Sequence, residues 1–141
     1  MSIRAVMLAI ISPVLAVLLG CGSGADTPKH VVKGRITYKG EPMEVAPMVG
    51  RLRVAFIAQD VPPPVDPKYA SVKADGTFEV RGDSAGSGIV PGRYKICVTW
   101  QDDYPLGPDK LDEQFSKDNS RIHRKIPDDG EIVIDVSRPE G

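Results

Sequence analysis

The sequence contains one dense local cluster of acidic residues. Six of them crowd residues 101–119, where Lys110 and Lys117 are the only cations: Asp102, Asp103, Asp109, Asp112, Glu113 and Asp118. Oxygen ligands of this kind suit Ca²⁺, but the spacing is not that of an EF-hand loop. The pattern therefore favours a solvated acidic loop, and a partner met there should be basic or bring a cation.

The patterns associated with catalysis lack their partners. Residues 82–86 read Gly-Asp-Ser-Ala-Gly, which fits the G-x-S-x-G pattern of serine hydrolases. That pattern needs a strand, a sharp turn and a helix in a large α/β sheet, whereas this stretch is typical of a flexible loop. His30 and His123 are the only histidines, and no Cys or His cluster has zinc spacing. The sequence predicts no catalytic residues, no metal site and no cofactor.

The first residues are typical of an export signal. Arg4 and the amino terminus precede an apolar run over 5–19, which only Ser12 and Pro13 interrupt. This order is that of a secretory signal peptide, which we place at 1–20. The alternative, a membrane-spanning anchor, needs about 20 apolar residues and does not suit a proline in mid-run.

The end of this run resembles the bacterial lipobox, because residues 18–21 read Leu-Leu-Gly-Cys. The resemblance implies that Cys21 is lipidated and becomes the new amino terminus, and several acyl chains hold a protein stably at a membrane. Gly22 stands where an Asp would favour the inner membrane, which implies the outer membrane in a cell that has one. Residues 21–29 then form the lipidated cysteine and a flexible tether that reaches about 26 Å.

The composition of the remaining chain favours short strands. It is rich in turn residues, with 25 glycines and prolines together in the 121 residues that follow the signal peptide. The formal net charge of −1 argues against a nucleic-acid-binding protein, which usually carries a basic face. Cys97 is the only cysteine after Cys21, so the mature chain has no intramolecular disulfide.

Apolar residues alternate with a period of two from His30 onward, as in strands that bury one face. Seven segments show this alternation: 32–38, 52–58, 70–72, 78–80, 94–100, 122–126 and 132–136. Only Lys110–Lys117, where Leu111 and Phe115 lie four apart, has the spacing of a short helix. On its strand, Cys97 shares a face with Lys95 and Thr99, which predicts a partly exposed thiol.

The turn at Asp75-Gly76 fixes one register. A three-residue loop, 74–76, would pair Lys73 with Thr77 and Val72 with Phe78, and this keeps the apolar side chains on one face. Alternating strand directions then bring loops 61–67, 82–92 and 127–130 to the tether end of the domain. Loops 39–50 and 101–120 and the Asp75-Gly76 turn come to the far end.

Three motifs in order resemble the carboxypeptidase regulatory-like family. They are Val-Lys-Gly-Arg-Ile at 32–36, Ala-Asp-Gly-Thr-Phe at 74–78 and Val-Pro-Gly-Arg-Tyr-Lys-Ile at 90–96. The resemblance implies a seven-stranded antiparallel β-sandwich of transthyretin-like (Ig-like Greek-key) type over 30–138, with a tail at 139–141. It also implies a small bacterial lipoprotein with an accessory or binding role, and it transfers no catalytic residues.

The leading functional hypothesis is a non-enzymatic binding or structural module, anchored at the cell envelope and meeting an envelope protein or polymer. The alternatives are a small periplasmic hydrolase of the transthyretin-related type, and a subunit whose edge strand pairs with another protein. The contact surface is predicted in the long acidic loop, facing away from the membrane. Its residues are Asp102, Asp103, Tyr104, Asp109, Asp112 and Glu113.

Overall fold

The computed structural model describes residues 27–44, 51–82, 88–101 and 106–137, and within them the chain forms strands and turns without a helix. The eight strands are β1 (Val32–Tyr38), β2 (Glu41–Pro42), β3 (Arg51–Ala58), β4 (Lys68–Ser71), β5 (Thr77–Val80), β6 (Gly92–Gln101), β7 (Ile122–Ile126) and β8 (Ile132–Asp135). The all-β class is confirmed. Each of the seven predicted segments overlaps a strand, and the two-residue β2 is an additional strand. No helix in the described part of the chain has the length and apolar character needed to cross a membrane.

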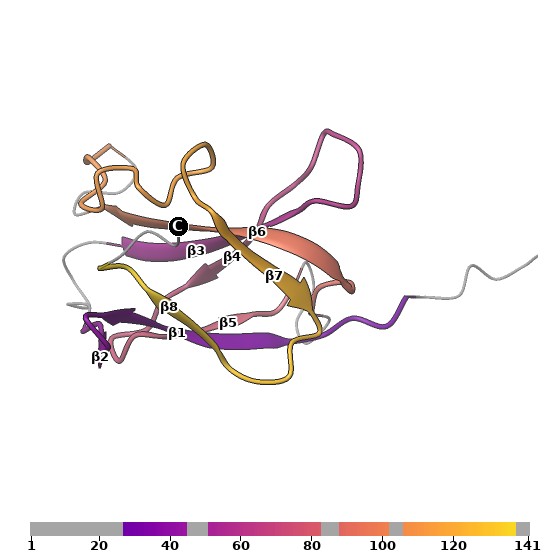
Figure 1. The fold of residues 1–141 in the computed structure, drawn as a ribbon, viewed down its shortest axis with the longest axis horizontal. Coiled ribbons are helices and arrows are strands. Elements are labelled where there is room, and N and C mark those ends of the chain that lie inside the picture. Colours follow the sequence, from indigo (N-terminus) through magenta and orange to yellow (C-terminus); the bar gives the residue numbers. More distant parts are fainter. Residues whose placement is uncertain (1–26, 45–50, 83–87, 102–105, 138–141) are drawn as a thin grey trace, which may run out of the picture.

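The strands form two sheets that lie one above the other (Figure 1). In the first sheet β1 pairs with β2, β5 and β8, and the second sheet has the order β4-β3-β6-β7. The pairing of β1 with β8 is parallel, so the expectation of a wholly antiparallel sandwich was wrong for this pair. Its cause lies in the path of the chain, because β8 begins at the same end of the sheet as β1, with Gly34 beside Ile132.

The core lies between the sheets, where the alternating apolar residues meet. Leu52, Val54 and Phe56 of β3 are almost completely buried, as the alternation predicts. The Phe56 ring packs against Phe78 of the first sheet at 6.2 Å between centroids, and against Tyr94 of β6 at 6.1 Å. Such tilted aromatic contacts add to the stabilisation from burial.

Gly34 explains why the first motif needs a glycine. A Cβ at this position would lie 2.3 Å from Cζ of Phe78 and 2.4 Å from the carbonyl oxygen of Ile132. The absent side chain therefore lets the Phe78 ring lie directly on β1 while β8 pairs alongside.

The turn at 74–76 is as predicted, but the hairpin is not. The Lys73 N–H donates to the Thr77 carbonyl at 2.8 Å, and Gly76 has the positive φ of +80° that a bulged three-residue loop requires. However, β4 pairs with β3 and β5 pairs with β1, and the Val72 N–H donates to Leu52 rather than pairing with Phe78. The turn therefore carries the chain from one sheet to the other.

The predicted helix at 110–117 was also wrong. This segment is a series of turns whose N–H groups bond three residues back, as from Gln114 to Leu111. Asp112 and Glu113 have φ values of 50° and 58°, and this left-handed backbone interrupts α-helical hydrogen bonding. Leu111 and Phe115 are nevertheless buried as predicted, because the segment packs along the edge of β6.

The loops lie at the ends that alternating strand directions predict. Val32, at the start of β1, lies beside Val80, and the bridge between His30 and Ile89 closes the same end. The ends of β3 and β7 meet the start of β6 there, so loops 59–67 and 127–131 gather at the tether end (Figure 1). The segment 106–120 lies at the far end.

Candidate functional site

Of the acidic residues predicted in the contact loop, the structure describes Asp109, Asp112 and Glu113. Asp102, Asp103 and Tyr104 lie outside the described residues. Oδ1 of Asp109 accepts hydrogen bonds from the N–H of Trp100 at 2.9 Å and of Leu111 at 3.1 Å, so this carboxylate closes its own loop. Asp112 and Glu113 are exposed, and the described residues contain no group of three side chains placed to hold a metal ion.

Cys97 is buried, so the prediction of a partly exposed thiol was wrong. The cause is the segment at Phe115–Ser120, where the acidic stretch ends. Its Phe115 carbonyl accepts from the N–H of Val98, and its Ser120 hydroxyl donates to the carbonyl of Ile96, on either side of Cys97. Burial raises the pKa of the Cys97 thiol, which keeps it protonated and unreactive.

The other candidate residues are scattered. Cys21 and residues 83–87, which include the serine of the G-x-S-x-G pattern, lie outside the described residues. His30 takes part in the bridge to Ile89 at the tether end, whereas His123 lies exposed on β7. The structure therefore does not bring the two histidines together.

The second sheet differs sharply from the first in charge. Its four strands contain seven lysines and arginines, one histidine and no acidic residue: Arg51, Arg53, Lys68, Arg93, Lys95, His123, Arg124 and Lys125. The strands of the first sheet contain two cations and three acids: Lys33, Arg35, Glu41, Glu79 and Asp135. The net charge of −1 conceals a basic sheet because many of the acids lie in loops.

The register of β6 with β7 places basic residues directly opposite one another. Arg93 lies beside Lys125, and Lys95 lies beside His123. These four side chains point outward, because the intervening Tyr94 on β6 is buried in the core. We call these four residues the basic patch. Like charges directly opposite one another destabilise a sheet, so the Arg93–Lys125 pair opposes folding rather than assisting it.

Asp60 is the one carboxylate within ion-pair distance of the basic patch in the described part of the chain. It accepts from the backbone N–H of Arg93 at 2.8 Å, and its Oδ1 lies 2.8 Å from a guanidinium nitrogen of the same residue. These hydrogen bonds hold the pKa of Asp60 below its usual range. Lys95 donates instead to the neutral carbonyl of Lys117 at 2.8 Å. The positive charge of the patch is therefore only partly compensated.

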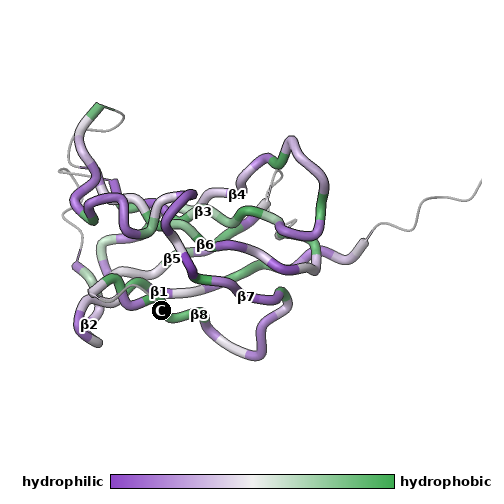
Figure 2. The backbone as a smooth tube through the Cα atoms, turned by 45° about the horizontal axis from the view of Figure 1, so that its top comes forward, coloured by the Kyte–Doolittle hydropathy of each residue, from purple (hydrophilic) through white to green (hydrophobic). Residues whose placement is uncertain are grey.

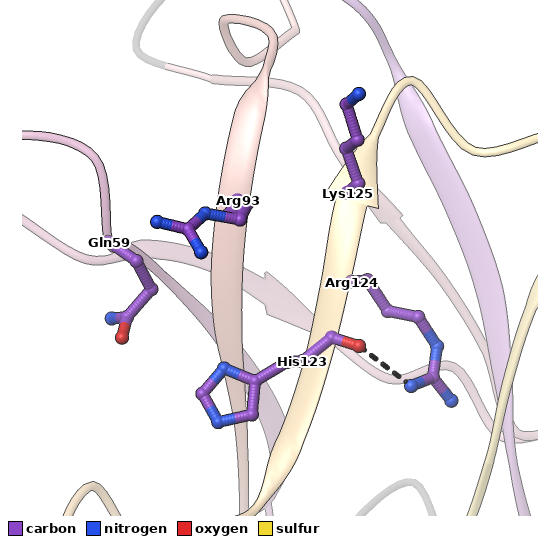
Figure 3. Close-up of a pocket in the computed structure, with 5 residues that line it drawn as sticks. All are labelled: Gln59, Arg93, His123, Arg124 and Lys125. Atoms are coloured by element: carbon purple, nitrogen blue, oxygen red, sulfur yellow. Dashed lines mark hydrogen bonds between the residues drawn. The ribbon is translucent and has the colours of Figure 1, made fainter.

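The patch borders an open depression of about 400 Å³, lined by Gln59, Arg93, His123, Arg124 and Lys125. Figure 3 shows Arg93 extending toward Gln59, while the His123 ring and the Arg124 guanidinium lie on opposite sides of β7. Arg124 donates to the carbonyl of His123 at 2.9 Å. In the described part of the chain no carboxylate orients the His123 ring, as a general base would require. The arrangement suits the binding of an anionic group more than catalysis.

Sequence reasoning missed this site because it depends on pairing between distant segments. The alternation of Arg93 with Lys95, and of His123 with Lys125, marks an outward face on each strand. It does not indicate that the two strands are neighbours, or which residues face one another.

The fold and the site define a two-sheet, all-β protein with one basic outer face. Comparison with family models, with curated proteins and with solved structures finds no match to this chain.

Proposed function

We propose that this chain is an envelope lipoprotein, anchored through Cys21 at the outer membrane, whose second sheet binds an anionic polymer. The observation that carries the proposal is the basic patch, in which Arg93 faces Lys125 and Lys95 faces His123 across β6 and β7, with one carboxylate in contact. The protein acts as a binding module rather than an enzyme, and its partner is an envelope polymer that bears phosphate, sulfate or carboxylate groups.

The spacing of the patch supports a polymer with regularly repeated charges. Residues two apart on a strand lie about 6.6 Å apart, and neighbouring strands lie about 4.8 Å apart. Arg93, Lys95 and Lys125 therefore form a regularly spaced set of positive positions on the outer face, with His123 at the fourth position. A polyanion that covers these positions releases its bound counterions and relieves the repulsion between the paired cations.

The proposal reverses the partner chemistry that the acidic loop predicted. A basic partner at the far end would need free carboxylates, and Asp109 is already engaged within its loop. Asp112 and Glu113 remain exposed there, and the proposal rests instead on the basic residues that face one another on the second sheet.

The fold type belongs to the same proposal. The domain is a transthyretin-like β-sandwich of the carboxypeptidase regulatory-like family, and the roles of the motif residues support this. Gly34 admits the Phe78 ring, Gly76 provides the positive φ of the turn, and the Tyr94 hydroxyl donates to the Val90 carbonyl at 2.8 Å.

The test compares two polymers that differ in charge alone. The lipidated protein in a non-ionic detergent is titrated with dextran sulfate and with neutral dextran, and backbone amide shifts are followed by NMR. Dextran sulfate should bind, with shifts centred on β6 and β7 and an affinity that falls as salt rises. Shifts confined to the Asp112-Glu113 turn, or equal binding of both polymers, would contradict the proposal.

A further inference from the structure

The end of the sandwich from which the tether leaves carries an apolar depression of about 280 Å³. Ala58 of β3 and Tyr94 of β6 contribute to its lining, and two loops form its remaining walls. The apolar lining residues of these two loops are Val61, Pro62, Pro64, Val65, Ile89 and Val90. Figure 2 shows hydrophobic segments on the loop between β3 and β4, at the end of the molecule where the tether leaves.

Hydrogen bonds fix both walls to the sheets. The His30 and Ile89 backbones exchange two hydrogen bonds of 2.8 Å, which hold the second wall against the start of β1. The first wall begins at Gln59, whose N–H donates to Arg93 at 2.9 Å, and at Asp60, which accepts from Arg93. Prolines at 62, 63, 64 and 67 restrict the backbone of this loop further. The walls are therefore formed before any ligand arrives.

These walls expose apolar side chains to solvent. Val61 is 47% exposed and Val90 is 39% exposed, on two different loops at the same end. Exposed valines on loops held in place can be buried by a partner without the loss of much chain entropy. Lys29, Lys68 and Asp66 also line the depression, so two positive groups and one negative group border the apolar walls.

The length of the tether limits what these valines can meet. Lys29 follows Cys21 by eight positions, and this stretch reaches about 26 Å when fully extended. Lys29 itself lines the depression. A bilayer that holds acyl chains on Cys21 therefore lies within reach of Val61 and Val90, while the far end of the sandwich points away from it.

We propose that the tether end of the sandwich docks on the bilayer, with Val61 and Val90 entering the boundary between headgroups and acyl chains. Lys29 and Lys68 then lie at the level of the lipid phosphates, as basic residues do at the edge of interfacial segments. This inference rests on the lipid anchor of the proposed function and does not depend on anion binding by the basic patch. The docked domain has a fixed orientation rather than swinging on its tether.

The experiment reads the depth of single tryptophans in the lipidated full chain, reconstituted in vesicles of phosphatidylcholine with brominated acyl chains. Val61→Trp and Val90→Trp should each lose about half of the added emission, because interfacial segments lie about 5–10 Å into this boundary. Leu106→Trp is the matched control, since Leu106 is apolar, 90% exposed and at the far end. Trp100, the only native tryptophan, provides the background of the unsubstituted protein.

Each result decides the question. Quenching of the tryptophan at 61 and at 90, but not at 106, supports docking. In a second test, Pro62→Trp reports depth in the Val61→Asp/Val90→Asp double variant, and docking predicts that this tryptophan is not quenched. If none of the three added tryptophans is quenched in protein that floats with the vesicles, docking is overturned and the anchor is left intact. Protein that does not float overturns both the anchor and the docking. If the tryptophan at 61 is not quenched but its emission is blue-shifted in detergent, docking is overturned, because the depression is then covered by the chain itself or by a second copy.

Discussion

The two sheets of this protein share one core but carry their surface charges in opposite ways. In the first sheet Lys33 lies beside Glu79, Arg35 pairs with Glu131 at 2.8 Å, and Asp135 accepts from the Gly40 N–H at 2.8 Å. Each of these charged groups faces a partner of opposite charge or a backbone donor. In the second sheet Arg93 faces Lys125 and Lys95 faces His123.

This difference in charge pairing shows which of the two surfaces is arranged to stabilise the fold. Opposite charges across neighbouring strands stabilise a sheet, and like charges destabilise it, so the first surface is arranged as stability requires. The second surface carries charges that folding does not favour. Changes to the shared core should therefore affect both sheets, whereas changes to surface charge should affect them with opposite signs.

The largest expected effect comes from the shared core. Phe56→Ala should lower the free energy of unfolding by about 3–5 kcal/mol, because it leaves a cavity between Phe78 and Tyr94. Urea denaturation measures the loss. Tyr69→Ala, at a side chain that is 54% exposed, should cost much less. Similar losses for the two variants would show that the sheets do not share the core described above.

The next effect concerns a carboxylate of the first sheet. Asp135 accepts hydrogen bonds from the backbone N–H of Gly40 and from both the N–H and the hydroxyl of Ser137. Asp135→Ala should lower the free energy of unfolding by about 1–2 kcal/mol at neutral pH. Asp128→Ala, at an exposed position in the 127–131 turn, is the control and should change little.

The same variant has a pH dependence of known sign. The hydrogen bond from the Ser137 hydroxyl is the largest cause that lowers the pKa of Asp135 below its usual range. Its stabilisation is therefore complete above the unfolded pKa, about 3.9, and disappears as pH falls through the lower folded value. The difference in unfolding free energy between the native protein and Asp135→Ala should shrink in that acid window. A difference that grows on acidification would contradict this role.

The sequence predicted the contents of each sheet better than their arrangement. Alternation at Leu52, Val54 and Phe56 marks a buried face, because a strand needs no other information to place its side chains. Gly76 likewise marks a turn, because few other residues adopt its φ. Both signals are local, and the structure confirms both.

The remaining features depend on contacts between distant segments. The pattern around residues 74–76 fits a hairpin equally well whether or not the two strands share a sheet. The burial of Cys97 requires the segment at Phe115–Ser120 to lie along β6, and the basic patch requires β7 to pair beside Arg93. None of these contacts is encoded in the spacing of neighbouring residues.

The comparison is most sharply tested by one substitution made in each sheet. Lys33→Glu and Lys125→Glu change the net charge equally, at exposed positions on β1 of the first sheet and β7 of the second. The first places Glu beside Glu79 and should lower the free energy of unfolding by about 0.2–1 kcal/mol; the second places Glu beside Arg93 and should raise it by a similar amount. Chemical denaturation of both variants, under the same conditions, measures these changes.

The central claim is tested most directly by the binding of dextran sulfate to these two variants. Lys125→Glu should bind at least about tenfold more weakly than the native protein, because it removes one cation and places a carboxylate beside another. Lys33→Glu should bind as the native protein does. A stabilised Lys125→Glu with weakened binding would show that the patch is kept for an anionic partner. Equal binding by the native protein and both variants would contradict that account.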